Sequence, residues 1–375
     1  PRELGSAEEN ETPIFSTNAI ALLKARPMKT RGHFLEILLT IGLASVTLSA
    51  QEEATAVLPE EAEKYYRILK KSPSRDYLYD RFINAWLETE PLSALPEFFI
   101  AQSDRDAAEL SDHMLAGIYF SRKGDVENAL KYFDRAVALD PAAAEAHLQR
   151  GRLFAREIRF DEAVTALDEA LASETVEEKQ LLEIGKLKGR YLARSGKTEE
   201  ALETWRELLE NFPEDLYLHE DVVEALAGEG LLVAAIESAI SLAEKSDDAY
   251  DRLVRQFRIA ELHVLADEQP EAITVYEEAF ANTGAGSWLE REILARVGTI
   301  HRREDDLEGL RLWTESLVEA FPQRIELLQY QAELAAETGD EERAVELCGE
   351  ILRKSPGDRS VQDSYVDILA ATDQI

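Results

Sequence analysis

A spacing of 34 residues between equivalent side chains restricts the fold of this chain more than any other feature of its sequence. The equivalent pairs are Gly117 and Gly151, Phe120 and Phe154, Ala129 and Ala163, and Ala136 and Ala170. Each unit of this length contains two helical stretches joined by a short turn, and no segment shows sustained strand alternation. The sequence therefore predicts an all-α chain of repeated helix pairs, each packed against its neighbours.

Side-chain size within one unit follows a rule that close helix packing explains. Small residues at unit positions 8, 20 and 27 allow two helices to cross closely, and large residues at positions 4, 11 and 24 fill the space beside them. Proline at position 32 ends the second helix, and glycine near position 15 allows the turn between the helices. The packing residues that this pattern assigns are Gly117, Phe120, Ala129, Phe133, Ala136, Pro141, Gly151, Phe154, Ala163, Ala170, Gly189, Ala201, Trp205, Pro213, Ala344 and Pro356.

This pattern resembles the tetratricopeptide repeat (TPR) family, whose units also span 34 residues. The resemblance implies a right-handed superhelical solenoid of antiparallel helix pairs with a concave groove. It covers seven TPR-like units over residues 110–358, preceded by divergent helical repeats over residues 51–109. Residues 359–375 begin a further helix but lack the polar capping helix that normally ends an array, which leaves open whether the natural polypeptide continues beyond Ile375.

The N-terminal segment has the outline of a secretory signal peptide over residues 28–50. Met28 opens a short basic segment, an apolar run follows, and small residues precede a cut after Ala50. We therefore interpret residues 1–27 as an upstream extension that contributes nothing to the fold, and expect export to the periplasm or cell envelope of a bacterium. Glu36 inside the apolar run favours the alternative, an amphipathic helix docked on the array of a cytoplasmic protein.

Charge and cysteine content exclude several classes of function. The chain has 75 acidic and 41 basic residues, a formal net charge of -34. The electrostatic field of this negative charge repels nucleic acid and anionic membranes, so we expect neither as the main partner. The same field favours partners with basic surfaces. Cys348 is the only cysteine, so a disulfide within the chain is impossible and a thiolate zinc site is not expected.

The sequence predicts neither a metal site nor a catalytic site. Five histidines occupy large packing positions in five different units, whereas metal ligands must converge on one ion: His113, His147, His219, His263 and His301. The common phosphate-binding, metalloprotease and nucleophile-elbow motifs do not occur, and no carboxylate pair stands out from the acidic background. We therefore expect no enzyme activity and no cofactor, and interpret the four tryptophans as structural residues.

A small group of cations is the one candidate binding site. In the TPR architecture, first-helix positions 2, 5, 9 and 12 face the groove, and Arg152, Lys186 and Arg190 fall there, with Arg156 and Arg194 one residue beyond. One interpretation is local ion pairing with Glu145, Glu183 and neighbouring acids. The other is a site for a carboxylate or an acidic peptide. The chaperone-type carboxylate clamp of the family has lysine and asparagine on an early first helix, where this chain has Met114 and Ile118.

Together these features predict a non-catalytic scaffold that presents a groove to a protein or peptide partner. One alternative is the TPR module of a larger enzyme or of a secretion or assembly machine. A second alternative is a cytoplasmic co-chaperone, which the missing clamp residues disfavour. No direct membrane insertion is expected once a signal peptide is removed, and the sequence defines neither the partner nor the oligomeric state.

Overall fold

The computed structural model describes residues 58–73, 76–174, 176–356, 362–363, 365–366 and 369–370. Every regular element in these residues is a helix, so the predicted all-α fold of stacked helix pairs is confirmed. The predicted extension over residues 1–27 and the predicted signal peptide over residues 28–50 lie outside the described residues, as does most of the segment 359–375.

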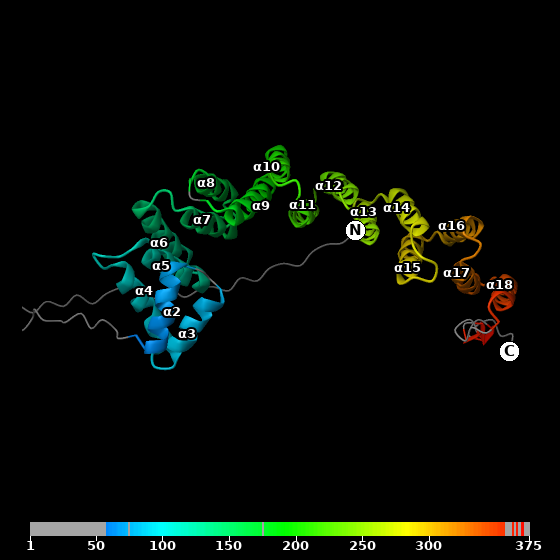
Figure 1. The fold of residues 1–375 in the computed structure, drawn as a ribbon, viewed down its shortest axis with the longest axis horizontal. Coiled ribbons are helices and arrows are strands. Elements are labelled where there is room, and N and C mark those ends of the chain that lie inside the picture. The colour runs from blue at the N-terminus through cyan, green and yellow to red at the C-terminus, as the bar shows by residue number, and fades with distance from the viewer. Residues whose placement is uncertain are drawn as a thin grey trace, which may run out of the picture. The chain divides into compact units, whose positions relative to one another are not determined.

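Residues 110–356 form seven consecutive pairs of antiparallel helices (Figure 1). The pairs are α5 (Leu110–Lys123) with α6 (Val126–Leu139), α7 (Ala144–Arg156) with α8 (Phe160–Leu171), α9 (Glu178–Arg194) with α10 (Thr198–Asn211), α11 (Leu216–Gly228) with α12 (Leu232–Glu244), α13 (Ala249–Leu265) with α14 (Gln269–Ala281), α15 (Trp288–Arg303) with α16 (Leu307–Ala320), and α17 (Ile325–Glu337) with α18 (Glu341–Lys354). We call the odd-numbered member of each pair its first helix. Each first helix from α7 onward also contacts the second helix of the pair before it.

The turn inside each pair depends on one residue with a left-handed backbone. Unit position 15 has a positive φ in all seven pairs: Gly124 (77°), Ile158 (61°), Gly196 (81°), Gly230 (76°), Asp267 (63°), Asp305 (55°) and Gly339 (78°). Glycine reaches this region without a steric penalty, which explains its frequency here. In three pairs the next residue is an aspartate that caps the second helix, and its carboxylate accepts a backbone N–H bond: Asp125 from Asn128, Asp306 from Gly309, and Asp340 from Arg343.

Close crossing inside the pairs explains the small residues at unit position 8. A Cβ atom added to Gly117 would lie 2.5 Å from the ring of Phe133, which stands at position 24 of the same unit. A Cβ atom on Gly189 would overlap the indole of Trp205, the corresponding residue two units later. The glycine therefore leaves room for a large ring, and the ring fills the crossing between the two helices.

Most residues that the repeat pattern assigns to packing are buried, and four are not. Phe154 is half-buried, with the guanidinium of Arg159 4.6 Å from its ring centroid. The prolines Pro141, Pro213 and Pro356 are exposed in the connections after second helices. They therefore act on the backbone at the ends of these helices and add little to the core.

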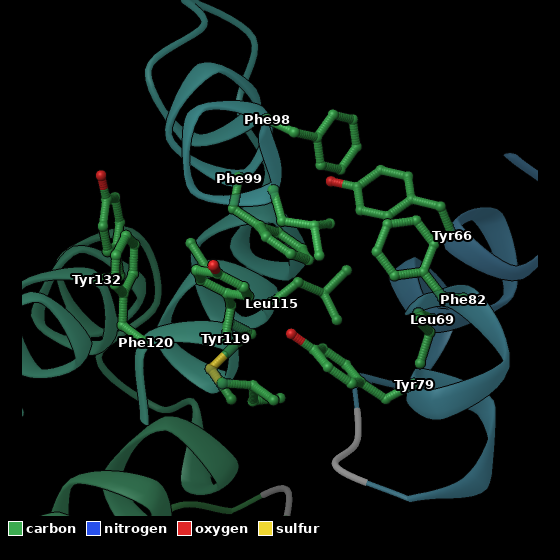
Figure 2. Close-up of a cluster of buried hydrophobic side chains, with 14 of the residues drawn as sticks. Tyr66, Leu69, Tyr79, Phe82, Phe98, Phe99, Leu115, Tyr119, Phe120 and Tyr132 are labelled. Atoms are coloured by element: carbon green, nitrogen blue, oxygen red, sulfur yellow. The ribbon is translucent and has the colours of Figure 1, made fainter. Parts of the chain in front are cut away.

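The N-terminal part of the described chain packs through aromatic rings. It comprises α2 (Glu60–Lys71), α3 (Tyr77–Leu87), the 3₁₀ turn η1 (Leu92–Ala94) and α4 (Leu95–Ser103), which meet α5 (Figure 2). The centroids of Tyr66 and Phe98 are 5.2 Å apart, and those of Phe99 and Tyr119 are 4.9 Å apart. The proline-containing segment that interrupts the repeat pattern is helical because Pro96 lies in the first turn of α4, where no intrahelical N–H bond is lost.

A buried carboxylate joins α2 to α5. Asp112 has no exposed side-chain surface, and it accepts hydrogen bonds from the Tyr66 hydroxyl at 3.0 Å and from the Lys70 ammonium at 3.0 Å. It also caps its own helix by accepting from the backbone N–H of Glu109 at 3.0 Å. Burial, followed by the Asp112 charge and hydrogen bond, raises the pKa of the Tyr66 hydroxyl far above its usual value.

Candidate functional site

The five predicted partner-binding cations lie on two neighbouring first helices. Arg152 and Arg156 are on α7, and Lys186, Arg190 and Arg194 are on α9. All five retain some exposed surface. The three cations of α9 face the next unit, because each of them contacts an acid of α11 or of the turn that follows it.

Each of these cations has a partner within the chain. Arg152 pairs with Glu183 of α9, and Arg156 donates to the carbonyl oxygen of Ser121 at 3.0 Å. Lys186 lies 2.6 Å from a carboxylate oxygen of Asp221, Arg194 lies 2.9 Å from Glu229, and Arg190 reaches Glu229 at 3.5 Å. Of the two interpretations of this basic group, local ion pairing therefore describes the observed contacts. Arg190 has the longest of these pairings, and 43% of its side chain is exposed.

Ion pairs of the same kind continue along the later units. We call seven of these pairs the ion-pair ladder, which links each first helix from α7 to α15 with the next unit: Arg152–Glu183, Lys186–Asp221, Arg194–Glu229, Arg255–Glu220, Arg258–Glu224, Arg296–Glu261 and Arg302–Glu337. Five of the seven pairs join residues 35 positions apart in the sequence. The ladder therefore follows the repeat, one unit to the next.

In the middle of the ladder, a helix that supplies acids lies between two helices that supply cations. The acids of α11, Glu220, Asp221 and Glu224, receive cations from α9 on one side and from α13 on the other. Exposed ion pairs each contribute roughly 0–1 kcal/mol, so the ladder specifies which surfaces meet more than it stabilises them. The hydrogen bond from Arg302 holds the pKa of the Glu337 carboxyl below its usual value, in agreement with a formed pair at the far end.

Three consecutive first helices that the ladder joins each expose one large aromatic side chain near the start of the helix. The exposed fractions are 83% for Tyr217 on α11, 52% for Tyr250 on α13 and 55% for Trp288 on α15. Trp288, interpreted from the sequence as a structural residue, is therefore more than half exposed at the start of its helix. Tyr217 stands at unit position 2, a groove-facing position, so the sequence did contain a signal for it.

Two hollows lie away from the ladder. A cavity of about 420 Å³ separates the second helices α10 and α12 and is lined by Trp205, His219, Leu226 and Lys245. A second hollow of about 410 Å³ lies beside Tyr79, Leu92 and Tyr119 at the N-terminal helices. Neither receives any of the five predicted cations.

Histidine and cysteine side chains occupy the packing positions that the sequence assigns to them. His113, His147, His219 and His301 are buried in four different units, and burial raises the pKa of the Cys348 thiol. Within the described ranges, no three histidine, cysteine, aspartate or glutamate side chains gather closely enough to hold a metal ion. No helix of the same ranges combines the length and apolarity that crossing a bilayer requires.

The face of α5 that corresponds to the carboxylate clamp of the family is buried in this chain. Met114 and Ile118, which stand where the clamp has polar residues, are 3% and 0% exposed. They belong to the core that the N-terminal helices form with α5. A partner therefore has no access to that face of α5.

An all-α array of antiparallel helix pairs joined by left-handed turns defines the class of helical repeat proteins. Residues 114–175 and 186–252 match the model of the tetratricopeptide repeat family, so this part of the chain consists of tetratricopeptide repeats. This fold suggests a protein–protein interaction scaffold, and the family is generally non-catalytic. No curated protein matches the chain.

Several solved structures are similar to this chain at low sequence identity. YrrB, described as a TPR protein with an unusual peptide-binding site, is 18% identical with a TM-score of 0.36, and the match covers 52% of this chain and 97% of YrrB. MamA from residue 41 to its end, from Desulfovibrio magneticus RS-1, is 17% identical with a TM-score of 0.34, over 46% of this chain and 94% of that one. The match to the Cut9–Hcn1 hetero-tetramer of APC/C is 15% identical with a TM-score of 0.34, and it covers 82% of this chain and 52% of the other.

Proposed function

We propose that this protein is a non-catalytic scaffold that binds an extended segment of a partner protein across its first helices. The observation that carries the proposal is the continuous face from α7 to α17, on which neighbouring helices are tied by ion pairs while large aromatic side chains remain exposed. Surfaces that expose several large apolar side chains within a polar frame are typical of protein interaction sites.

A site-specific cross-linking experiment tests the proposed face. A photoreactive amino acid replaces Tyr217 on α11 in one variant and Val233 on α12 in the matched control, whose side chain is 68% exposed on a second helix. We expect a discrete cross-linked partner in the native host from position 217 and none from position 233. Equal cross-linking from both positions, or from 233 alone, would contradict the proposed face.

The predicted basic group enters this proposal through Arg190, whose pairing with Glu229 is 3.5 Å long and whose own side chain is 43% exposed. We propose that Arg190 receives an acidic group of the partner. Arg190→Glu should weaken binding with an unchanged circular dichroism spectrum, because Arg194 still neutralises Glu229. Arg206→Glu on the second helix α10, where the side chain is 60% exposed, is the control. Unchanged binding of the Arg190 variant at low salt, where exposed electrostatic contacts are strongest, would exclude this contact.

We further propose that the protein is exported to a bacterial cell envelope, as the segment 28–50 predicts. The mature protein then begins near Gln51. N-terminal sequencing of the protein from its native host is the test. Recovery from the cytoplasm of a product that retains residues 1–27 would overturn this location.

A further inference from the structure

The exposed aromatic side chains share helix stripes with the ion-pair ladder. Residues three or four positions apart lie on one side of a helix. By this rule each aromatic residue lies within two helical turns of an ion-paired residue on the same side of its own helix: Tyr217 of Glu220 and Glu224, Tyr250 of Arg258, and Trp288 of Glu292 and Arg296.

The ladder joins these three stripes. Arg258 of α13 lies 2.7 Å from Glu224 of α11 and 3.3 Å from Glu261, which in turn pairs with Arg296 of α15. The first helices of a stacked array run in the same direction, so their N-terminal ends lie at the same edge. Tyr217, Tyr250 and Trp288 therefore form one row along that edge, which we call the aromatic row.

The aromatic row has no partner in the described part of the chain. Among the described residues, none forms a hydrogen bond, a ring stack or a cation–π contact with these three side chains. Other exposed rings are engaged: Tyr77, for example, has the Arg81 guanidinium 5.8 Å from its ring centroid. The row thus presents three free π faces, and an exposed aromatic surface of this kind favours a ligand that covers it.

The charges around the row favour a cation. The exposed acids Glu214, Asp247 and Asp251 lie beside Tyr217 and Tyr250, and none of the three forms an ion pair with another described residue. Lys245, Arg252 and Arg291 are cations near the same helix starts, and none of them forms an ion pair with a described residue. The caps Asp215 and Asp248 add two further carboxylates, so acids still outnumber cations here, on a chain whose formal net charge is -34.

The helix ends at this edge are closed to anions. Their first backbone N–H groups already donate to capping side chains: Asp215 on α11, Asp248 on α13 and Ser287 on α15. An acidic ligand would find these donors occupied and would face the surplus carboxylates. A guanidinium or ammonium group would instead stack on a ring and receive hydrogen bonds from a nearby carboxylate.

We propose that the aromatic row binds a basic, extended segment of a partner protein, with arginine or lysine side chains stacked on Tyr217, Tyr250 and Trp288. This inference rests on the proposed function and specifies its ligand. An extended chain advances about 3.3 Å per residue, so basic side chains spaced along such a segment can reach successive rings of the row.

Fluorescence anisotropy with synthetic peptides tests this chemistry on the full chain. The probe is a labelled peptide of repeated Arg-Ser-Ala triplets, compared with peptides in which leucine or glutamate replaces every arginine. We expect the arginine peptide to bind, and replacement of all three row residues by alanine to weaken it about tenfold or more, since each exposed cation–π contact contributes roughly 0.5–1 kcal/mol. Phenylalanine at the same three positions should restore most of the binding.

Tyr77→Ala is the control for loss of an exposed aromatic residue, because Tyr77 is 69% exposed on α3 and lies outside the row. It should leave binding of the arginine peptide unchanged. The inference is overturned if the alanine variant of the row binds the arginine peptide as tightly as the parent chain does. It is also overturned if the leucine peptide binds equally well. If a partner still cross-links from position 217, either of these results leaves the proposed binding face intact. Loss of that cross-linking would refute the binding face itself.

Discussion

The left-handed residue at unit position 15 shows how much of this architecture depends on single backbone positions. Aspartate tolerates this conformation better than most residues, and it stands there in two units, at 267 and 305. Ile158 is the exception, because a β-branched side chain with φ near +61° is strained. Its side chain is 76% exposed and has little packing to compensate for the strain.

Replacing Ile158 by glycine should therefore stabilise the protein by about 1 kcal/mol. Relief of the left-handed strain contributes roughly 1–3 kcal/mol, and the greater freedom of glycine in the unfolded chain offsets part of it. The urea midpoint is the measurement. Asp267→Gly is the control and should gain less, and a lower midpoint for the Ile158 variant would show that the turn is not strained.

Two helical glycines with opposite surroundings test the packing rule. Gly189→Ala should destabilise the chain by about 1–3 kcal/mol, because its methyl group meets the Trp205 indole at the helix crossing. Gly228→Ala should be neutral or stabilising by up to about 1 kcal/mol, since a Cβ there meets nothing within 4 Å. Thermal or urea unfolding compares them, and equal effects of the two substitutions would contradict the assigned repeat positions.

Burial of His219 gives the stability a pH dependence with a defined sign. Burial, and then the nearby Lys245, lowers the pKa of His219 below its ordinary value of 6.5. The folded state therefore binds fewer protons than the unfolded state as the pH falls through 6.5, and stability is lost on acidification. His219→Gln should lose less stability between pH 8 and pH 5.5 than the parent, by urea unfolding at each pH. An equal loss would show that His219 does not contribute.

At the scale of helices, the ion-pair ladder determines which surfaces of neighbouring units meet. Arg258→Glu should destabilise the chain by about 1–2 kcal/mol, because it places a third carboxylate beside Glu224 and Glu261. Adding Glu224→Arg should recover part of that loss. A double-mutant cycle from urea midpoints at low salt measures the coupling, and additive effects would show that the pair does not interact.

The helices themselves could be predicted from the sequence because packing inside a pair is local. Positions 8 and 24 of one unit are joined by a single turn, so the spacing that places Gly117 against Phe133 is visible in the sequence. Period, pair boundaries and most buried residues follow from this local rule.

Contacts between units could not be predicted in the same way. Which acid pairs with each ladder cation depends on how one helix pair is rotated against the next. Because the chain is acidic, several acids lie about 35 residues from every cation, and the sequence does not distinguish between them. The aromatic row was missed at Tyr250 and Trp288 because α13 and α15 begin a few residues ahead of unit position 1. The groove positions counted from the repeat therefore do not include these extra turns.

At the scale of the whole molecule, the core is a series of adjoining clusters instead of one centre. Trp86 lies in the cluster of the N-terminal helices, Trp205 in the cluster of the middle units, and Trp313 in the cluster that follows. Arrays whose units contact only their neighbours can unfold in parts. Each of the three tryptophans therefore reports on a different part.

We expect three variants, each retaining one of these tryptophans with phenylalanine at the other tryptophan positions, to give different urea midpoints by fluorescence. The control is the far-UV circular dichroism transition, which should be broad and span the range of the three. Three coincident fluorescence transitions that also match circular dichroism would show a single cooperative unit and contradict this prediction.

The charges in the middle of the ladder have a consequence for which unit can be lost. Recombination between similar tandem units removes a whole unit at a time. Loss of the fourth unit here would set Lys186 and Arg194 of α9 against Arg255 and Arg258 of α13, cation facing cation. The helix pairs look interchangeable by their cores, yet the charges of α9, α11 and α13 oppose the loss of this particular unit.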